Sequence, residues 1–348
     1  MSNSRRPPRG AAGRPAAPTR VAKVRDPGDI VSVIPYLVGF TPTESVVLIA
    51  LEGARQRFGP CLRMDLVDDP RDSAAQASHL VEIVRRHGFD PVVVVAFAAG
   101  GEVADAVIGA LLSRLSERAV AVKEALRADG RRWWSYTCAD PECCPPEGTA
   151  YDVETSRMAA EAVLCGMARA ESRDALRAQL GPAGAAERAR FARLCRAAPL
   201  GATPEVLAMR LQAGLVSVGD LSMTDRAALV TAVQDVRCRD QAWAAMTRAD
   251  ADAHYLLWRE LLRLVPDDLL PPVGALAAFS AWLWGQGVLA SHAVDRVADV
   301  DPAYSMMVLI RGLLDMAISP EVWGELQTGR GELGREGSKP EGHRGGGS

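Results

Sequence analysis

The strongest constraint on the fold of this chain is a change in hydrophobic periodicity near residue 150. Up to that point, apolar runs typical of strands alternate with segments whose apolar residues recur every three or four positions. Beyond it, only the helical repeat remains. This pattern predicts an α/β domain, with a layered mixed sheet and flanking helices, followed by an all-α helical domain. A length of 348 residues suits two domains, because single cores seldom grow beyond about 250–300 residues.

The first half contains the predicted strands, at residues 45–51, 61–67, 91–97, 119–126 and 131–136. The first two are separated by a short polar turn and are predicted to form a hairpin. Asp129 and Gly130 predict a second hairpin between the last two. Amphipathic helical segments follow 61–67 and 91–97. Two successive strand-helix-strand units predict parallel strands joined by right-handed crossovers.

We place the α/β domain at residues 26–150 and the all-helical domain at residues 151–326. In the second of these, residues 273–290 carry no formal charge over about the length that spans a bilayer. A break at residues 285–287 nevertheless favours a buried hairpin of two shorter helices over a membrane span. The spacing of Ala278, Ala290 and Pro302 is similar to that of one tetratricopeptide-type helical pair.

Both ends of the chain have the composition of solvated tails. Residues 1–25 contain arginine and lysine among Pro, Gly and Ala, with no acidic residue, and predict a disordered basic tail. Its alternative role is an arm for nucleic acid or acidic lipid. Residues 327–348 predict a disordered Gly-rich tail. Because the net charge is −3, we do not expect nucleic-acid binding by the protein as a whole. The absence of a secretory signal pattern predicts a cytoplasmic location.

Three cysteines within seven positions form the most unusual local feature: Cys138, Cys143 and Cys144. They follow the last predicted strand, in a Pro-rich loop. Thiolates on such a loop can converge on zinc, with Asp140, Glu142 or a histidine as fourth ligand. Two alternatives remain open. Cys138 can form a reversible disulfide with Cys143 or Cys144, or all three can be fillers of the loop.

The strand that precedes this loop carries four further candidate binding residues, Arg132, Trp133, Trp134 and Tyr136. Successive side chains of a strand point to opposite faces, so at most one of the two tryptophans can lie in the core beneath the sheet. The other, beside an arginine, could stack on a base or a sugar. The alternative is that these aromatic rings serve only to pack the sheet against its neighbours.

No recognisable catalytic set emerges from the sequence, and this absence shapes the functional hypothesis. We expect a non-enzymatic ligand- or metal-binding module, in which the helical domain contacts a protein partner. The alternative is an enzyme that acts on a small or nucleotide-like molecule in a cleft at the ends of strands 61–67 and 91–97, where α/β proteins often bind ligands.

Several sequence segments carry a resemblance to a known family: Asp26-Pro27-Gly28-Asp29, Ile34-Pro35-Tyr36-Leu37-Val38-Gly39-Phe40, Arg132-Trp133-Trp134-Ser135-Tyr136 with Cys138 and Cys143-Cys144-Pro145, and Trp284 to Gly287 with Asp301-Pro302. Together they resemble the actinobacterial family called domain of unknown function 4192, over roughly residues 24–314. That family has no assigned activity, so the resemblance transfers no catalytic residue. It does imply that the tryptophan-cysteine segment is a family hallmark.

Overall fold

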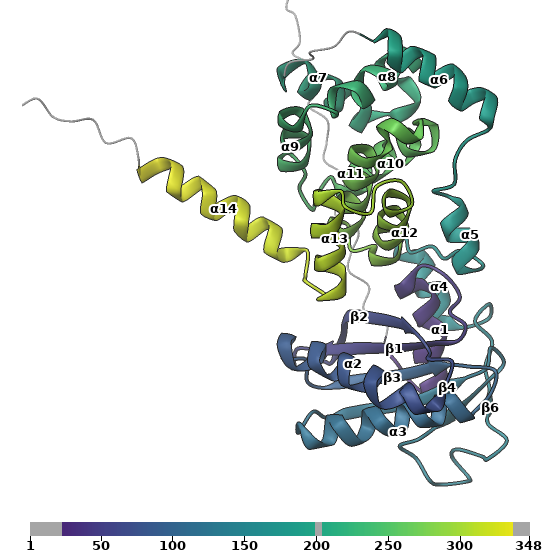
Figure 1. Ribbon diagram of the computed structural model, residues 1–348. Helices are drawn as coiled ribbons and strands as arrows, with labels where there is room; N and C mark the ends of the chain where they lie inside the picture. Colours follow the sequence, from purple (N-terminus) through teal and green to yellow (C-terminus); the bar gives the residue numbers. More distant parts are fainter. Residues whose placement is uncertain (1–22, 199–203, 337–348) are drawn as a thin grey trace, which may run out of the picture.

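The computed structural model describes residues 23–198 and 204–336. A layered sheet with helices lies against a larger helical part, and a long terminal helix projects from the latter (Figure 1). The predicted basic tail falls almost entirely outside the described residues, with only 23–25 inside them.

The sheet has six strands in the order β2-β1-β3-β4-β5-β6. Their bounds are β1 (Ser45–Glu52), β2 (Arg57–Asp65), β3 (Val92–Phe97), β4 (Val122–Ala128), β5 (Arg132–Ser135) and β6 (Thr149–Ala150). Only β3 and β4 pair in parallel, and the other neighbouring strands are antiparallel. The predicted layered mixed sheet and both predicted hairpins, β1–β2 and β4–β5, are confirmed.

The position of β1 is the feature of the sheet that the sequence pattern did not predict. β1 is antiparallel to both β2 and β3 and lies between them. The two strand-helix-strand units therefore do join parallel strands, but only β3 and β4 are neighbours. β1 and β3 are buried along nearly their whole length, because their continuous apolar sequences suit strands covered on both faces.

Alternate residues of these central strands point into two different cores. Val46, Leu48 and Val94 lie in a core with α2 (Ser73–His87) and α3 (Glu102–Glu117), which cover one face of the sheet. Val47 and Val95 point the opposite way, into a core that includes α1 (Pro27–Val38) and the helical part. The sheet thus forms the middle layer of its half of the molecule.

Among the described residues after 150, the secondary structure is helical, apart from one isolated bridge between Ala170 and Phe40. The helices are α4 (Arg157–Leu164), α5 (Arg173–Ala178), α6 (Ala185–Ala197), α7 (Pro204–Val216), α8 (Met223–Ala232), α9 (Val236–Ala244), α10 (Ala251–Leu264), α11 (Leu270–Leu283), α12 (Gly287–Ala298), α13 (Ser305–Asp315) and α14 (Glu321–Glu336). The predicted change of periodicity is confirmed.

α11 is the central helix of the helical part. All of its residues except Pro271 are buried. It approaches α12 closely, since a Cβ on Gly274 would lie 2.4 Å from a methyl group of Val297. The turn between them contains Gly285 at a φ of +87°. The predicted buried hairpin is present, whereas its tetratricopeptide-like character remains a prediction. Nowhere in the described part of the chain is there a helix with the length and apolarity to cross a membrane.

Packing does not change at the predicted domain boundary of 150/151. Met158 and Ala162 of α4 pack against Val33 of α1. The amide of Ala170 also donates to the carbonyl of Gly39, at 2.8 Å. The largest core extends without interruption from α1 and the sheet to α13. The ranges 26–150 and 151–326 therefore stay a prediction based on secondary structure, and the two halves share one core.

The first part of the predicted Gly-rich tail is helical, because α14 continues to Glu336. Trp323 anchors this helix on the body of the protein, stacking with Trp243 at 5.6 Å between ring centroids and meeting Phe279 at 4.9 Å. Its indole N–H donates to the carbonyl of Met246 at 2.9 Å. This anchor outweighs the low helix propensity of the glycines that follow. The rest of the predicted tail, residues 337–348, lies outside the described residues.

Candidate metal centre

The cysteine loop leaves the sheet from β5 and returns to it as β6. Trp133 pairs with Thr149, and Arg132 pairs with Ala150. The other side of β5 pairs with β4, where Ala128 lies opposite Trp133. Both ends of the loop are thereby held by one short antiparallel ladder, so the loop starts and ends at the same edge of the sheet.

Hydrogen bonds inside the loop set the positions of the three cysteines. The Ser135 hydroxyl accepts from the amide of Cys138 at 3.1 Å. The carbonyl of Asp140 accepts from the amides of Cys143 and Cys144, at 3.2 and 2.7 Å. The Asp140 carboxylate in turn accepts from the amide of Glu142 at 2.9 Å. This turn brings the adjacent pair of cysteines back toward Cys138.

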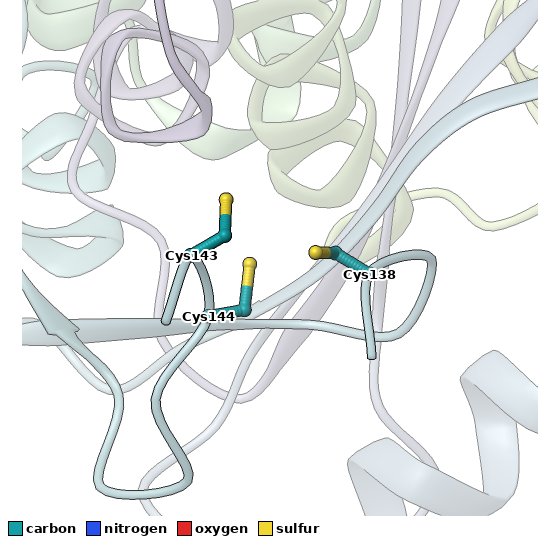
Figure 2. A group of neighbouring side chains, drawn as sticks. All are labelled: Cys138, Cys143 and Cys144. Carbon is teal, nitrogen blue, oxygen red and sulfur yellow. The ribbon is translucent and has the colours of Figure 1, made fainter. Parts of the chain in front are cut away.

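The three sulfur atoms converge on one small volume, all within 4.8 Å of one another. Figure 2 shows Cys143 and Cys144 side by side on one limb of the loop, with Cys138 opposite them. All three are free thiols. Cys143 is exposed, whereas Cys138 and Cys144 are half-buried. Three sulfurs around one tetrahedral zinc, each about 2.3 Å from the metal, lie about 3.8 Å apart. The loop therefore satisfies the spacing of a three-thiolate site.

The predicted fourth ligand is not brought to the cluster. Neither Asp140 nor Glu142, nor any histidine in the described parts of the chain, belongs to the group that the three sulfurs form. A metal held here would keep one coordination position for a molecule from outside the loop. Cys143 is the solvent-exposed member of the three.

The local environment shifts the pKa values of Cys138 and Cys144 in opposite directions. A hydrogen bond from the backbone of Asp140 lowers the pKa of Cys138, and the Cys144 side chain acts in the same direction. Burial, followed by the neighbouring thiols, raises the pKa of Cys144 to about 12. A divalent cation between the sulfurs would favour the thiolate form of all of them, because its charge exceeds the other local charges. Metal binding would accordingly release protons.

The four candidate residues of the preceding strand all support the sheet and the loop. Trp133 is buried in the large core with an exposed fraction of 6%. Trp134, on the other face of β5, stacks under the guanidinium of Arg127 at 3.8 Å from the ring centroid. Its indole N–H donates to the carbonyl of Pro146 at 3.1 Å. The predicted division of the two tryptophans between opposite faces is present.

Arg132 and Tyr136 also have partners within the chain. Arg132 donates to the carbonyl of Gly148 at 2.7 Å, and the hydroxyl of Tyr136 donates to the carboxylate of Asp105. Burial, followed by this carboxylate, raises the pKa of Tyr136. These contacts give Arg132, Trp134 and Tyr136 a role in positioning the loop. A stacking shelf for a base or a sugar remains a hypothesis.

Two carboxylates at the carboxyl end of β2, near the strand ends proposed for the enzyme alternative, are engaged in ion pairs. Asp65 lies between Arg63 and Arg173, and Asp69 binds Arg71. One shallow hollow of about 340 Å³ is lined by residues from Leu112 to Thr137, away from these carboxylates. Arg63 and Arg173 are far apart in the chain and match no motif, so no sequence pattern marks them as a pair.

Fold and candidate site together define a class of protein: an α/β sheet fused through its core to a helical array, with a three-cysteine loop at the sheet edge. The family model described as "Domain of unknown function (DUF4192)" matches residues 27–321. The chain belongs to this family, as the resemblance implied. No curated protein and no solved structure matches it.

Proposed function

We propose that this protein is a non-enzymatic, cytoplasmic zinc-binding module whose metal ligands are Cys138, Cys143 and Cys144. The observation that carries the proposal is the convergence of three free thiols within 4.8 Å, on a loop held at both ends. Thiolates favour zinc among the common divalent ions. A reducing compartment keeps such thiols available for a metal.

The fourth position gives the proposed zinc its function. Structural zinc sites are closed by four protein ligands, whereas sites that act on an outside molecule keep one position open. The described residues supply three. The zinc would therefore bind a donor atom of an exchangeable ligand. Three thiolates and one divalent ion carry a net charge of −1, so a neutral donor such as imidazole would complete the site without adding negative charge.

We further propose that the helical part contacts a protein partner. Its support is a set of exposed apolar side chains on α13 and α14, which are Val308, Leu309, Val322 and Leu326. Figure 1 shows α14 projecting from the body of the molecule. Contiguous exposed apolar groups are typical of interaction surfaces.

Metal analysis tests the zinc proposal. The full chain, purified with reductant and equilibrated with zinc, is expected to retain one zinc ion per chain after gel filtration. The triple variant with Cys138, Cys143 and Cys144 replaced by serine is expected to retain none. The matched control is Cys165→Ser, which alters an exposed cysteine outside the loop, directly after helix α4.

Two results would contradict the zinc proposal. One is wild-type protein that retains no zinc and whose melting temperature responds to neither zinc nor chelator. The other is a disulfide between Cys138 and Cys143 or Cys144, found by mass spectrometry in protein kept under cytoplasmic redox conditions. The second result would support the redox alternative.

A further inference from the structure

A second group of polar residues gathers where the sheet meets the helical part. It comprises Arg63 of β2, Arg173 and Arg177 of α5, and His292 of α12. Helices α5 and α12 contact each other, and Figure 1 shows them above the sheet, at the junction of the two halves. We call this group the junction cluster. It shares no residue with the cysteine loop.

Two guanidinium groups of the junction cluster converge on a single carboxylate. Arg173 donates to Asp65 at 2.8 Å, and Arg63 forms an ion pair with the same side chain. Arg63 is held firmly, since its Nε and Nη2 also donate to the hydroxyl of Ser45 at 3.0 and 2.6 Å. Only 11% of the Arg63 side chain is exposed. The single negative charge of Asp65 is thus shared by the two positive charges of Arg63 and Arg173.

Arg177 adds a third positive charge. It lies four residues after Arg173 on α5, which places both on the same face of the helix. Arg177 is exposed, and within residues 23–198 and 204–336 it has no ion-pair partner. Asp295 of α12, the acid that acts on His292, lies 3.8 Å from Arg311. The junction cluster therefore carries more positive than negative charge.

His292 is the buried member of the group. It is 1% exposed, and neither of its ring nitrogens has a hydrogen-bond partner. Burial lowers its pKa to about 4, and the charges of Arg173, Arg177 and Arg63 act in the same direction, against Asp295. A buried polar group without a hydrogen-bond partner is destabilising. A bound acceptor would remove this cost.

We infer that the junction cluster binds an oxyanion, the phosphate or carboxylate group of a small molecule. Arg173 and Arg177 supply guanidinium donors that remain open to solvent, and His292 supplies an unused imidazole donor beside them. Guanidinium groups bind both oxyanions with paired, charge-assisted hydrogen bonds. Because the cluster joins β2 to α5 and α12, such a ligand would also bridge the two halves of the protein.

The test uses the full chain with two probes, inorganic phosphate and malonate, titrated by calorimetry at constant ionic strength. We expect saturable binding of at least one probe. Arg177→Gln should weaken it about tenfold, as expected for the loss of a charged hydrogen bond. The control Arg237→Gln changes an exposed arginine of α9 that pairs with Asp235, and should leave binding unchanged. Binding of phosphate alone assigns a phosphate ligand; binding of malonate alone assigns a carboxylate.

A second measurement does not depend on any variant at Arg177. The imidazole signals of His292, assigned by comparison with His292→Gln, should titrate at a higher pH when the probe is bound, since a nearby anion favours the imidazolium. If neither probe saturates, or if both arginine variants bind equally well, the inference is wrong. The arginines would then serve only to neutralise Asp65.

Discussion

Replacement of Gly148 by alanine tests whether Trp134 holds the cysteine loop in place. Gly148 has a φ of +81°, and a Cβ at this position would lie 2.5 Å from the indole ring of Trp134. Gly130 provides the matched control. Its φ is +94°, yet a Cβ there would meet nothing within 4 Å. Both substitutions place an alanine in the left-handed region, and only one of them displaces the ring.

The expected magnitudes follow from these contacts. An alanine in the left-handed conformation costs about 1–2 kcal/mol, which both variants incur. Displacing Trp134 also weakens its stacking with Arg127, by about 0.5–2 kcal/mol. Its hydrogen bond to Pro146 contributes about 0.5–1.5 kcal/mol more. We therefore expect the free energy of unfolding to fall by about 2–5 kcal/mol in Gly148→Ala and by about 1–2 kcal/mol in Gly130→Ala.

Urea denaturation followed by circular dichroism measures both losses, in the presence of a chelator so that no metal compensates for a displaced loop. The comparison is valid if the two variants and the wild type show the same slope with urea. If the two losses agree within about 0.5 kcal/mol, the indole ring of Trp134 moves aside at no cost. Such a result would show that Trp134 does not position the loop.

Two further predictions concern His292 and α14. In the unfolded chain His292 takes up a proton near its ordinary pKa of 6.5, whereas in the folded protein it does so only near 4. The neutral, buried His292 therefore contributes to the free energy of unfolding. This contribution is complete above pH 6.5, is lost as the pH falls toward 4, and amounts to about 3 kcal/mol at most. His292→Gln should flatten the dependence of the urea midpoint on pH between 4 and 6.5, and an unchanged slope would contradict the assigned cause. Trp323→Ala should release α14 and increase amide hydrogen exchange along it, because the helix loses its stacking with Trp243 and its hydrogen bond to Met246. Val322→Ala, at an exposed neighbouring position, should leave the exchange unchanged, and equal exchange in both variants would show that the anchor lies elsewhere.

Local pattern predicted the elements of this fold better than their arrangement. The strands β1 and β3 are evident from continuous apolar sequence, and the turn at Gly130 from its dipeptide. The insertion of β1 between β2 and β3 could not be predicted in this way, because β-sheet pairing depends on contacts between distant residues. The glycines after residue 323 favoured a tail, whereas the stacking of Trp323 on the body favours helix α14.

The two candidate sites also differ in how far the sequence alone predicts them. Cys138, Cys143 and Cys144 lie within seven positions, so sequence spacing alone predicted that they could converge. The absence of a fourth ligand among the described residues depends on the geometry of the loop. Arg63 and His292 are more than two hundred residues apart in the chain. Neither belongs to a motif, and only the fold brings α5, which pairs with β2 through Arg173 and Asp65, into contact with α12.

The burial of α11 has a consequence for how the protein is made. Residues 270–283 are apolar on every side, so this helix has no face suited to water. Two of the helices that cover it, α12 and α13, lie later in the chain. A growing polypeptide therefore carries an incompletely covered apolar segment until translation has passed residue 315, by which time the sheet has long been synthesised. During that interval the exposed apolar surface makes the nascent chain prone to aggregation.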